Sequence, residues 1–414
     1  MIEFKKHILG NGLTVIAHRD DTTPMAAVNV LYKVGAKNES PDKTGFAHLF
    51  EHLMFGGSIN IPSYDSPLQL VGGENNAFTN NDYTDYYIVL PKDNIETALW
   101  LESDRMLSLA FNEKSLEVQR KVVIEEFKQR YLNQPYGDLW LLMRPMVYEK
   151  HPYRWPTIGM TPDHISNATM EDVKAFFKKY YNPQNAILSV AADIGPDEVF
   201  RMAEKWFGGI PAGEKPVVEL PAEPVQTEAR RLEVDRPVPA TAIVIAFHMG
   251  PRMSREYYVC DVMTDILACG NSSRLYQRLV KESGLFSSVN AYVTCDIDPG
   301  LIVFTGHLLP GVDASDAEKA IWKEIGDIKN VAVSDYELTK VRNKYESDMI
   351  FGELNVMNVA MNLGYYEMLG DAAILNTEVE SHNSVTKEEI ISAANKILTV
   401  ENSSTLIYRS QNGN

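Results

Sequence analysis

An internal repeat constrains the fold of this chain more than any other feature of its sequence. Residues 27–35 in the first half have a counterpart at 241–250 in the second, and both are rich in strand-forming residues. Each is followed by a helical stretch that ends in glycine, at Gly56 and at Gly270, so an offset of 214 residues (270 − 56) superposes the endings. The repeat predicts two copies of one structural unit.

The length of the chain supports the same division. With 414 residues it exceeds what one hydrophobic core usually serves. Between Pro211 and Glu228 the sequence becomes rich in proline and glutamate and loses its periodicity, which is typical of a linker. We therefore predict an N-terminal domain at 1–212, a linker at 213–228 and a homologous C-terminal domain at 229–414.

Strand-like and helical patterns alternate along the chain, which predicts a mixed α/β fold. The strand-like runs of the first half lie at 13–17, 27–34, 86–90 and 186–192. A capping box formed by Asp93 and Glu96 is expected to begin the first long helix.

Composition argues against several classes of protein. No apolar run approaches the roughly 18 residues that span a bilayer, and the N-terminus leads into a strand-like segment, so we expect a cytoplasmic protein without a membrane segment. Cys260, Cys269 and Cys295 form no Cys-x-x-Cys pair, which favours buried free thiols over disulfides. The net charge of −17 argues against nucleic-acid binding, which needs a positively charged surface. If acidic residues line a cavity, basic peptides would be favoured as partners, although an excess of acidic residues usually serves only to keep a protein in solution.

Residues 48–52, His-Leu-Phe-Glu-His, form the inverted HxxEH motif of inverzincins. On a helix, His48 and His52 project about 40° apart, so both imidazoles can reach one ion. Glu51 flanks them, where its carboxylate can take a proton from a water without acting as a ligand. The alternative is a surface helix with solvated histidines. Apolar neighbours make burial the better interpretation: Phe46, Leu49, Phe50, Leu53 and Met54.

A third ligand is needed, because a catalytic zinc site has three protein ligands and an open position for water. One helical face within residues 116–131 contains Gln119, Val122, Val123 and Glu126. Glu126 is therefore expected to project inward with the valines, while Glu125 turns away by about 100°. A divalent cation would compensate the buried carboxylate; a salt bridge to a buried arginine or lysine is the alternative. Zinc is expected, although manganese or cobalt could bind such ligands.

The second copy lacks this chemistry. Under the offset of 214, the two histidines and Glu51 fall on Val262, Ile266 and Asp265, and Glu126 falls on Lys340. Only the first half could hold a metal.

Residues 72–79, followed by Tyr86 and Tyr87, are small and β-compatible. They could form a sheet edge that pairs with an extended peptide, which would give backbone recognition with little sequence preference. A plain hairpin is the simpler alternative.

Together these features resemble the pitrilysin or insulinase (M16) family of metallopeptidases, and most closely its short members of the mitochondrial processing peptidase type (M16B). The resemblance spans nearly the whole chain. It rests on Asn11-Gly12-Leu13, Gly45 to Ser58, Gly73 to Thr84, Arg120 to Glu126, Tyr148, His151-Pro152-Tyr153 and Gly159.

The resemblance implies a duplicated LuxS/MPP-like metallohydrolase fold of α+β class, whose two homologous α/β halves each contain an antiparallel-rich sheet packed with helices. With a second pair of halves they would enclose a chamber for peptides and unfolded segments. The implied activity is that of a zinc metalloendopeptidase. His48, His52 and Glu126 would bind one Zn²⁺ per chain, and Glu51 would be the general base. The residues implied to hold the substrate backbone are Asn76, Ala77, Phe78 and Thr79.

Two departures from the family pattern affect these expectations. Gln119 stands where many relatives have glutamate, and its amide could orient the ligands from outside the coordination sphere. In the second half, Val280 and Ser287 replace an arginine and a tyrosine that grip the substrate. We therefore expect the catalytic subunit of a heterodimer whose homologous partner supplies that pair. The alternatives are a self-sufficient homodimer and a non-catalytic core or assembly subunit of the same fold.

Overall fold

The computed structural model describes residues 1–411, which divide into two compact units. Unit 1 consists of 1–130, 151–221 and 350–377, and unit 2 consists of 131–150, 222–349 and the chain from 378 onward. Each unit thus includes one segment that belongs by sequence to the other half. The domain boundaries predicted at residues 212 and 229 concern the two copies of the sequence repeat, and they stay a prediction.

Unit 1 contains a six-stranded sheet with the order β1-β2-β6-β3-β5-β4. Its strands are β1 (Lys5–Ile8), β2 (Thr14–Arg19), β3 (Met25–Tyr32), β4 (Glu74–Thr79), β5 (Thr84–Pro91) and β6 (Ala186–Ala192). β2 and β6 pair in parallel, and the other neighbours are antiparallel. The four strand-like runs predicted in the first half are confirmed as β2, β3, β5 and β6.

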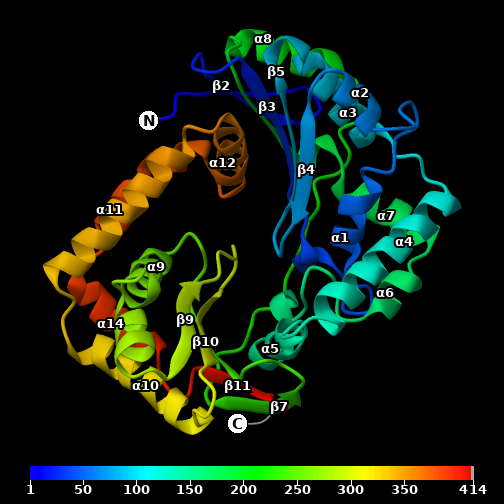
Figure 1. Ribbon diagram of the computed structural model, residues 1–414. Helices are drawn as coiled ribbons and strands as arrows, with labels where there is room; N and C mark the ends of the chain where they lie inside the picture. Colours follow the sequence, from blue (N-terminus) through cyan, green and yellow to red (C-terminus); the bar gives the residue numbers. More distant parts are fainter. Residues whose placement is uncertain (412–414) are drawn as a thin grey trace. The chain divides into compact units, whose positions relative to one another are not determined.

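Helices cover both faces of this sheet (Figure 1). The helices of unit 1 are α1 (Phe46–Leu53), α2 (Asp65–Leu70), α3 (Ile95–Leu107), α4 (Glu113–Phe127), α6 (Pro162–Ser166), α7 (Met170–Tyr180), α8 (Pro196–Phe207) and α12 (Val356–Met368). α3 and α8 pack on one face, and α12 packs against β3 and β6 on the other. Gly364 permits this close approach, because a β-carbon there would lie 2.9 Å from Asn29 Oδ1 and from Ser189 Oγ.

One helix start differs from the prediction. α3 begins at Ile95 after a 3-10 turn at Lys92–Asn94, and its N-cap residue Asn94 makes no side-chain capping bond. The predicted capping box of Asp93 and Glu96 is therefore wrong, since Asp93 lies within the preceding turn.

Unit 2 repeats the architecture with a five-stranded sheet, β7-β11-β8-β10-β9. Its strands are β7 (Arg230–Arg236), β8 (Ala242–His248), β9 (Phe286–Val293), β10 (Leu301–Leu308) and β11 (Ser403–Ser410). β7 and β11 are parallel, and the other pairs are antiparallel. The order and directions reproduce those of β2-β6-β3-β5-β4, so the predicted duplicated α/β fold is confirmed.

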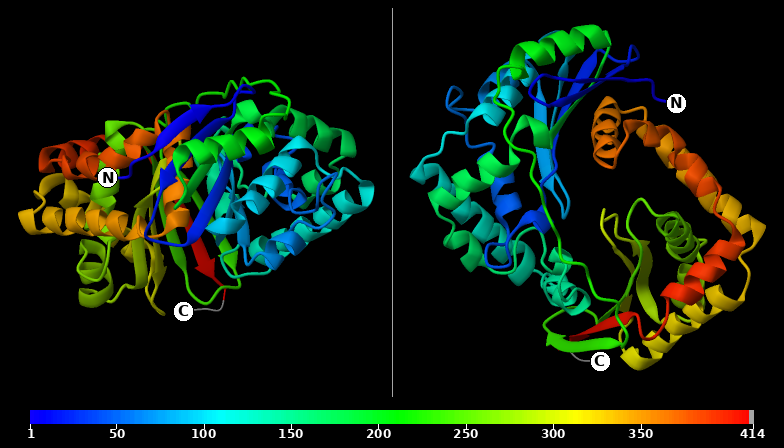
Figure 2. Two further views of the ribbon diagram at one scale, coloured as in Figure 1. Left: turned by 90° about the horizontal axis from the view of Figure 1, so that it is seen from above. Right: turned by 180° about the vertical axis from the view of Figure 1, so that it is seen from behind.

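In Figure 2 the second sheet can be found by its red strand β11. The helices of unit 2 pack against this sheet and against one another. They are α5 (Leu139–Val147), α9 (Arg255–Ala268), α10 (Ala314–Asn330), α13 (Glu378–Asn383) and α14 (Lys387–Ile397), with α11 (Asp335–Gly352) ending just inside unit 1. The hydrophobic core of the unit contains Ile245, Phe247, Met263 and Phe304, which come from β8, α9 and β10.

Several simpler predictions can also be compared with the structure. From 211 to 227 the chain has no regular secondary structure, as expected of a linker. Within residues 1–411 no helix is both long and apolar enough to cross a membrane. The three cysteines are unpaired, but only Cys260 is buried, so the prediction of buried thiols is wrong for Cys269 and Cys295.

Candidate metal centre

The HxxEH motif lies on α1, a short helix that is packed on its apolar side. Phe46, Leu49 and Phe50 are each at most 3% exposed, and the Phe50 ring stacks on Phe176. The side chains of the two histidines stay accessible, at 12% for His48 and 24% for His52. Burial of the motif's surroundings is confirmed, and the alternative of a solvated surface helix is not what the chain forms.

The three predicted ligands come together. Nε2 of His48 and Nε2 of His52 lie 3.7 and 3.3 Å from the same atom, Oε2 of Glu126. One ligand atom from each residue lies within 4.8 Å of the other two, and the described residues contain no second group of this kind. Zinc bonds of about 2.1 Å in a tetrahedron separate neighbouring ligand atoms by about 3.4 Å. The observed spacing therefore fits a zinc ion.

The protonation states of these groups also suit a cation. Burial lowers the pKa of His48, which keeps its imidazole neutral near pH 7. The hydrogen bond with His52 lowers the pKa of Glu126, which keeps this carboxyl group ionised. Neutral imidazole and carboxylate are the forms that bind metal, so little proton release would oppose binding.

Glu51 lies beside the ligands and contacts the neighbouring strand. Burial raises its pKa, while a hydrogen bond with the side chain of Thr79 in β4 acts in the opposite direction. A carboxylate with a raised pKa is a stronger base, which suits a group that accepts a proton. The same hydrogen bond joins the HxxEH helix to the strand predicted to hold substrate.

Helix α4 presents Glu126 to this centre. Asn112 caps its start by accepting the Ser115 N–H at 2.7 Å. Glu125 points outward and pairs with Lys128 at 2.6 Å, as predicted. Val123 is buried but Val122 is 43% exposed, so the prediction that both valines face inward is wrong for Val122, which lies at the margin of the packed face.

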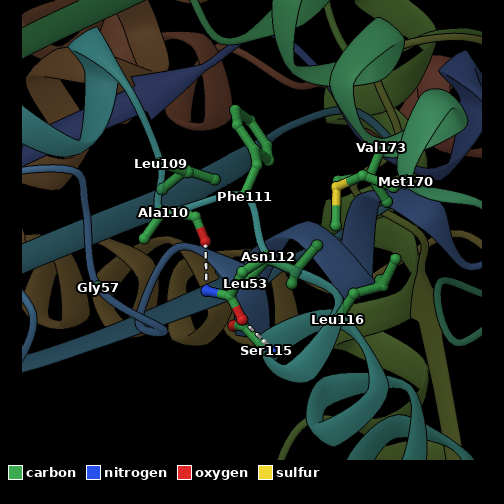
Figure 3. A pocket seen from close by; sticks show the side chains of 10 residues that line it. All are labelled: Leu53, Gly57, Leu109, Ala110, Phe111, Asn112, Ser115, Leu116, Met170 and Val173. Carbon is green, nitrogen blue, oxygen red and sulfur yellow. Dashed lines mark hydrogen bonds between the residues drawn. The ribbon is translucent and has the colours of Figure 1, made fainter.

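Apolar side chains join α4 to α1 and α7. Figure 3 shows Leu53 of α1, Leu116 of α4 and Val173 of α7 around one small cavity, together with the Asn112 capping bond. The cavity measures about 10 Å³, which is about the space of one water molecule. The helices that carry the ligands are thus closely packed, and the ligand spacing is held by the core.

Arg130 is a member of the centre that the sequence reasoning missed. Its Nη1 lies 2.9 Å from Oε1 of Glu126, the oxygen that does not face the histidines. This arginine side chain is 68% exposed, so the alternative of a buried salt bridge does not describe Glu126. The i, i+4 spacing of Glu126 and Arg130 is the signal that could have predicted the pair.

The predicted substrate residues, Asn76 to Thr79, lie in β4 at the edge of the sheet. Within the described part of the chain β4 pairs only with β5, where Asn76 is opposite Tyr87. Both the edge and the hairpin interpretations therefore describe this strand. Asn76 Oδ1 accepts the N–H of Ala77 at 2.8 Å. That this edge binds substrate, and that Gln119 orients the ligands, stay predictions.

The two substituted positions lie in unit 2. Val280 packs against its hydrophobic core, and the Ser287 hydroxyl donates to the carbonyl of His307 at 3.1 Å. Neither side chain could replace a guanidinium or a phenol in gripping a peptide.

Two family models of one peptidase family match this chain. The family model described as Insulinase (Peptidase family M16) matches residues 14–140, and the one described as Peptidase M16 inactive domain matches residues 167–345. The zinc protease PqqE of Helicobacter pylori is 29% identical over 407 residues, which cover 97% of this chain and 91% of that protein. YmxG of Bacillus subtilis, an uncharacterized zinc protease, is 24% identical, with 99% of each chain covered.

A solved structure has the same fold. The crystal structure of a protease from Helicobacter pylori superposes with a TM-score of 0.94 at 28% identity, and the match covers 99% of this chain and 100% of that one. The relatives named as zinc proteases and the solved protease structure therefore share both sequence and fold with this chain.

Proposed function

Because this chain belongs to the M16 family of peptidases, we propose that it is a zinc-dependent endopeptidase for peptides or unfolded polypeptide segments. His48, His52 and Glu126 would hold one Zn²⁺ per chain. The observation that carries this proposal is the convergence of their three ligand atoms within 4.8 Å, from helices α1 and α4.

The metal ion and Glu51 would have different roles in peptide hydrolysis. A bound zinc ion supplies polarisation of the scissile carbonyl and acidification of a water. Glu51 takes the proton of that water and later delivers it to the leaving amine, so no covalent intermediate is needed. The hydrogen bond with Thr79 keeps the Glu51 carboxylate oriented during both transfers.

The free edge of β4 would hold the substrate in an extended conformation. A peptide that adds to this edge forms backbone hydrogen bonds, so recognition depends little on sequence. The Ala77 N–H, which Asn76 Oδ1 accepts in the free protein, is one donor that a substrate carbonyl would take over. Asn76, Ala77, Phe78 and Thr79 are the residues proposed to line this strand.

We further propose that the chain is the catalytic subunit of a heterodimer. Val280 and Ser287 favour this assembly over a homodimer, because neither can grip substrate as an arginine and a tyrosine would. A homologous subunit that carries the arginine and tyrosine is the expected partner.

Peptide hydrolysis by the purified chain alone tests both proposals. A mixed peptide library is incubated with the zinc-loaded protein and read by mass spectrometry, with a chelator and Glu51→Gln as controls. Cleavage abolished by both controls supports the peptidase and contradicts the need for a partner. A folded, zinc-loaded but inactive chain supports the heterodimer, and a folded chain that binds no zinc contradicts the peptidase.

A further inference from the structure

Glu39 is a buried carboxylate to which the proposed reaction assigns no role. The residue is 8% exposed. Its two oxygens accept the backbone N–H groups of Gly45 and Ala47, each at 2.8 Å. Burial raises its pKa to about 8, which shows how costly its charge is in this position. A group this costly calls for a structural reason.

The reason lies at the start of α1. The N-cap residue Gly45 has no side chain to bond the first amides, which lack partners within the helix. Glu39 supplies acceptors from outside for two of these amides, those of Gly45 and Ala47. Since α1 has only eight residues, its position depends strongly on this end. His48 follows Ala47 directly, so the capped turn carries the first proposed ligand.

The same short segment also holds the β4–β5 hairpin. The N–H groups of Ala36 and Lys37 donate to the carbonyls of Asn80 and Asn81 at 3.0 and 2.8 Å. Lys37 Nζ lies 2.8 Å from Asp82 Oδ1, with both side chains largely buried. Residues 80–82 lie in the turn, 80–83, that joins β4 to β5. Residues 35–39 therefore contact the turn of the edge strand at one end and the HxxEH helix at the other.

We propose that Glu39 is a positioning residue that, through residues 35–39, sets the zinc-binding helix α1 in register with the edge strand β4. This inference rests on the proposed peptidase function. Hydrolysis requires the base, the water and the scissile bond to meet within about 3–3.5 Å, and an error of about 1 Å can lower the rate about 100-fold. The hydrogen bond between Glu51 and Thr79 lies where the two elements meet.

The first experiment replaces Glu39 with glutamine in the full chain. The amide keeps one acceptor oxygen, but its NH₂ group faces a second backbone N–H that can no longer be accepted. We expect zinc affinity, measured by competition with a chelating dye, to fall about tenfold. We also expect the absorption spectrum of the cobalt-substituted protein to change, because the ligand geometry at His48 relaxes.

Glu378→Gln is the matched control. Glu378 is also buried but lies in unit 2, where it pairs with Arg252 at 3.2 Å and accepts from Tyr258 at 2.9 Å. This variant should lose thermal stability and keep wild-type zinc affinity and cobalt spectrum. If Glu39→Gln behaves in the same way, Glu39 is merely structural and the proposal is overturned.

A second variant tests the hairpin end. Lys37→Met breaks the ion pair with Asp82 and should raise the KM for peptide hydrolysis severalfold at unchanged zinc affinity. The proposed partner subunit is added if the chain alone is inactive, and an unchanged KM contradicts the coupling to β4. If Glu39→Gln does not fold, Glu39→Asp keeps the carboxyl group on a side chain one methylene shorter and carries the same expectation for zinc and cobalt. If the wild-type chain binds no zinc, the proposed function itself is contradicted. If the wild-type chain binds zinc and cleaves peptides, and the Glu39 variant has the same zinc affinity and cobalt spectrum, only this inference is contradicted.

Discussion

Strands β2-β6-β3-β5-β4 of the first sheet match strands β7-β11-β8-β10-β9 of the second in order and direction. Among residues 1–411, however, only the first sheet lies beside a set of candidate metal-binding side chains. In α9, the positions equivalent to the motif carry Val262, Asp265 and Ile266, and the two apolar residues are at most 4% exposed. The polar groups of the candidate metal centre in α1 face one another, whereas the equivalent apolar side chains of α9 face the core. The two halves thus share a backbone arrangement and differ at the four positions of the candidate metal centre, because Lys340 stands where the first half has Glu126.

Even the edge strands agree in detail. In β4 the N–H of Ala77 donates to Asn76 Oδ1 at 2.8 Å, and 214 residues later, in β9, the N–H of Ala291 donates to Asn290 Oδ1 at 2.9 Å. A side chain that satisfies an exposed edge donor discourages pairing with other edges. An asparagine side chain therefore accepts an edge N–H group in both sheets, and the candidate metal ligands are what distinguishes the first sheet from the second.

The largest difference should follow from changing the equivalent acidic residues. Glu51→Gln removes the proposed proton acceptor and should lower peptide hydrolysis about 100-fold or more, with zinc binding retained. Asp265→Asn, at the equivalent position in α9, should leave hydrolysis unchanged. The measurement is the initial rate on a fluorogenic peptide, with the proposed partner subunit added if the chain alone is inactive; equal losses in the two variants would contradict the division of roles.

Alanine at equivalent positions should have opposite consequences in the two helices. His52→Ala removes a proposed ligand and should abolish tight zinc binding with little change in the stability of the metal-free protein. Ile266→Ala should keep zinc affinity but cost about 2–5 kcal/mol of unfolding free energy, because it opens a cavity in the core. Zinc titration and chemical denaturation measure the two effects, and a zinc defect in Ile266→Ala would refute the distinction.

A smaller effect is expected at the second oxygen of Glu126. Arg130→Met frees Oε1, so the carboxylate can rotate, and zinc affinity should fall about tenfold. Unfolding free energy should change by less than about 1 kcal/mol, because the guanidinium is exposed. Lys128→Met, which breaks the Lys128–Glu125 pair on the same helix, should leave zinc affinity intact. Equal affinities for these two variants would show that Arg130 has no role at the metal.

The smallest effect concerns Asp265 and pH. Burial raises its pKa from 3.8 to about 6, so the folded protein holds this proton more tightly than the unfolded chain does. Its contribution to stability is therefore present below pH 3.8 and is lost as the pH rises to about 6. Asp265→Asn should remove this loss and stabilise the protein by on the order of 1 kcal/mol at pH 7, but not at pH 4. Thermal melts at both pH values measure the difference.

Much of this organisation could be predicted from local patterns. Strand periodicity located β2, β3, β5 and β6, and the i, i+4 spacing of His48 and His52 placed two side chains on one helical face. Glu126 was selected because a carboxylate on an apolar face needs a partner, and the structure brings it to both histidines. Each of these predictions depends on properties that a single helix or strand carries by itself.

The sequence by itself determined the repeat, the mixed α/β class and the three residues that meet as a candidate metal centre. Only the tertiary structure decided that α12 packs on the first sheet, that Val122 stays exposed, that Arg130 takes the second oxygen of Glu126 and that Glu39 caps α1. The physical reason is that periodicity sets which face of an element is apolar, whereas the partner that covers that face, or reaches an unpaired amide at its end, is chosen by long-range packing.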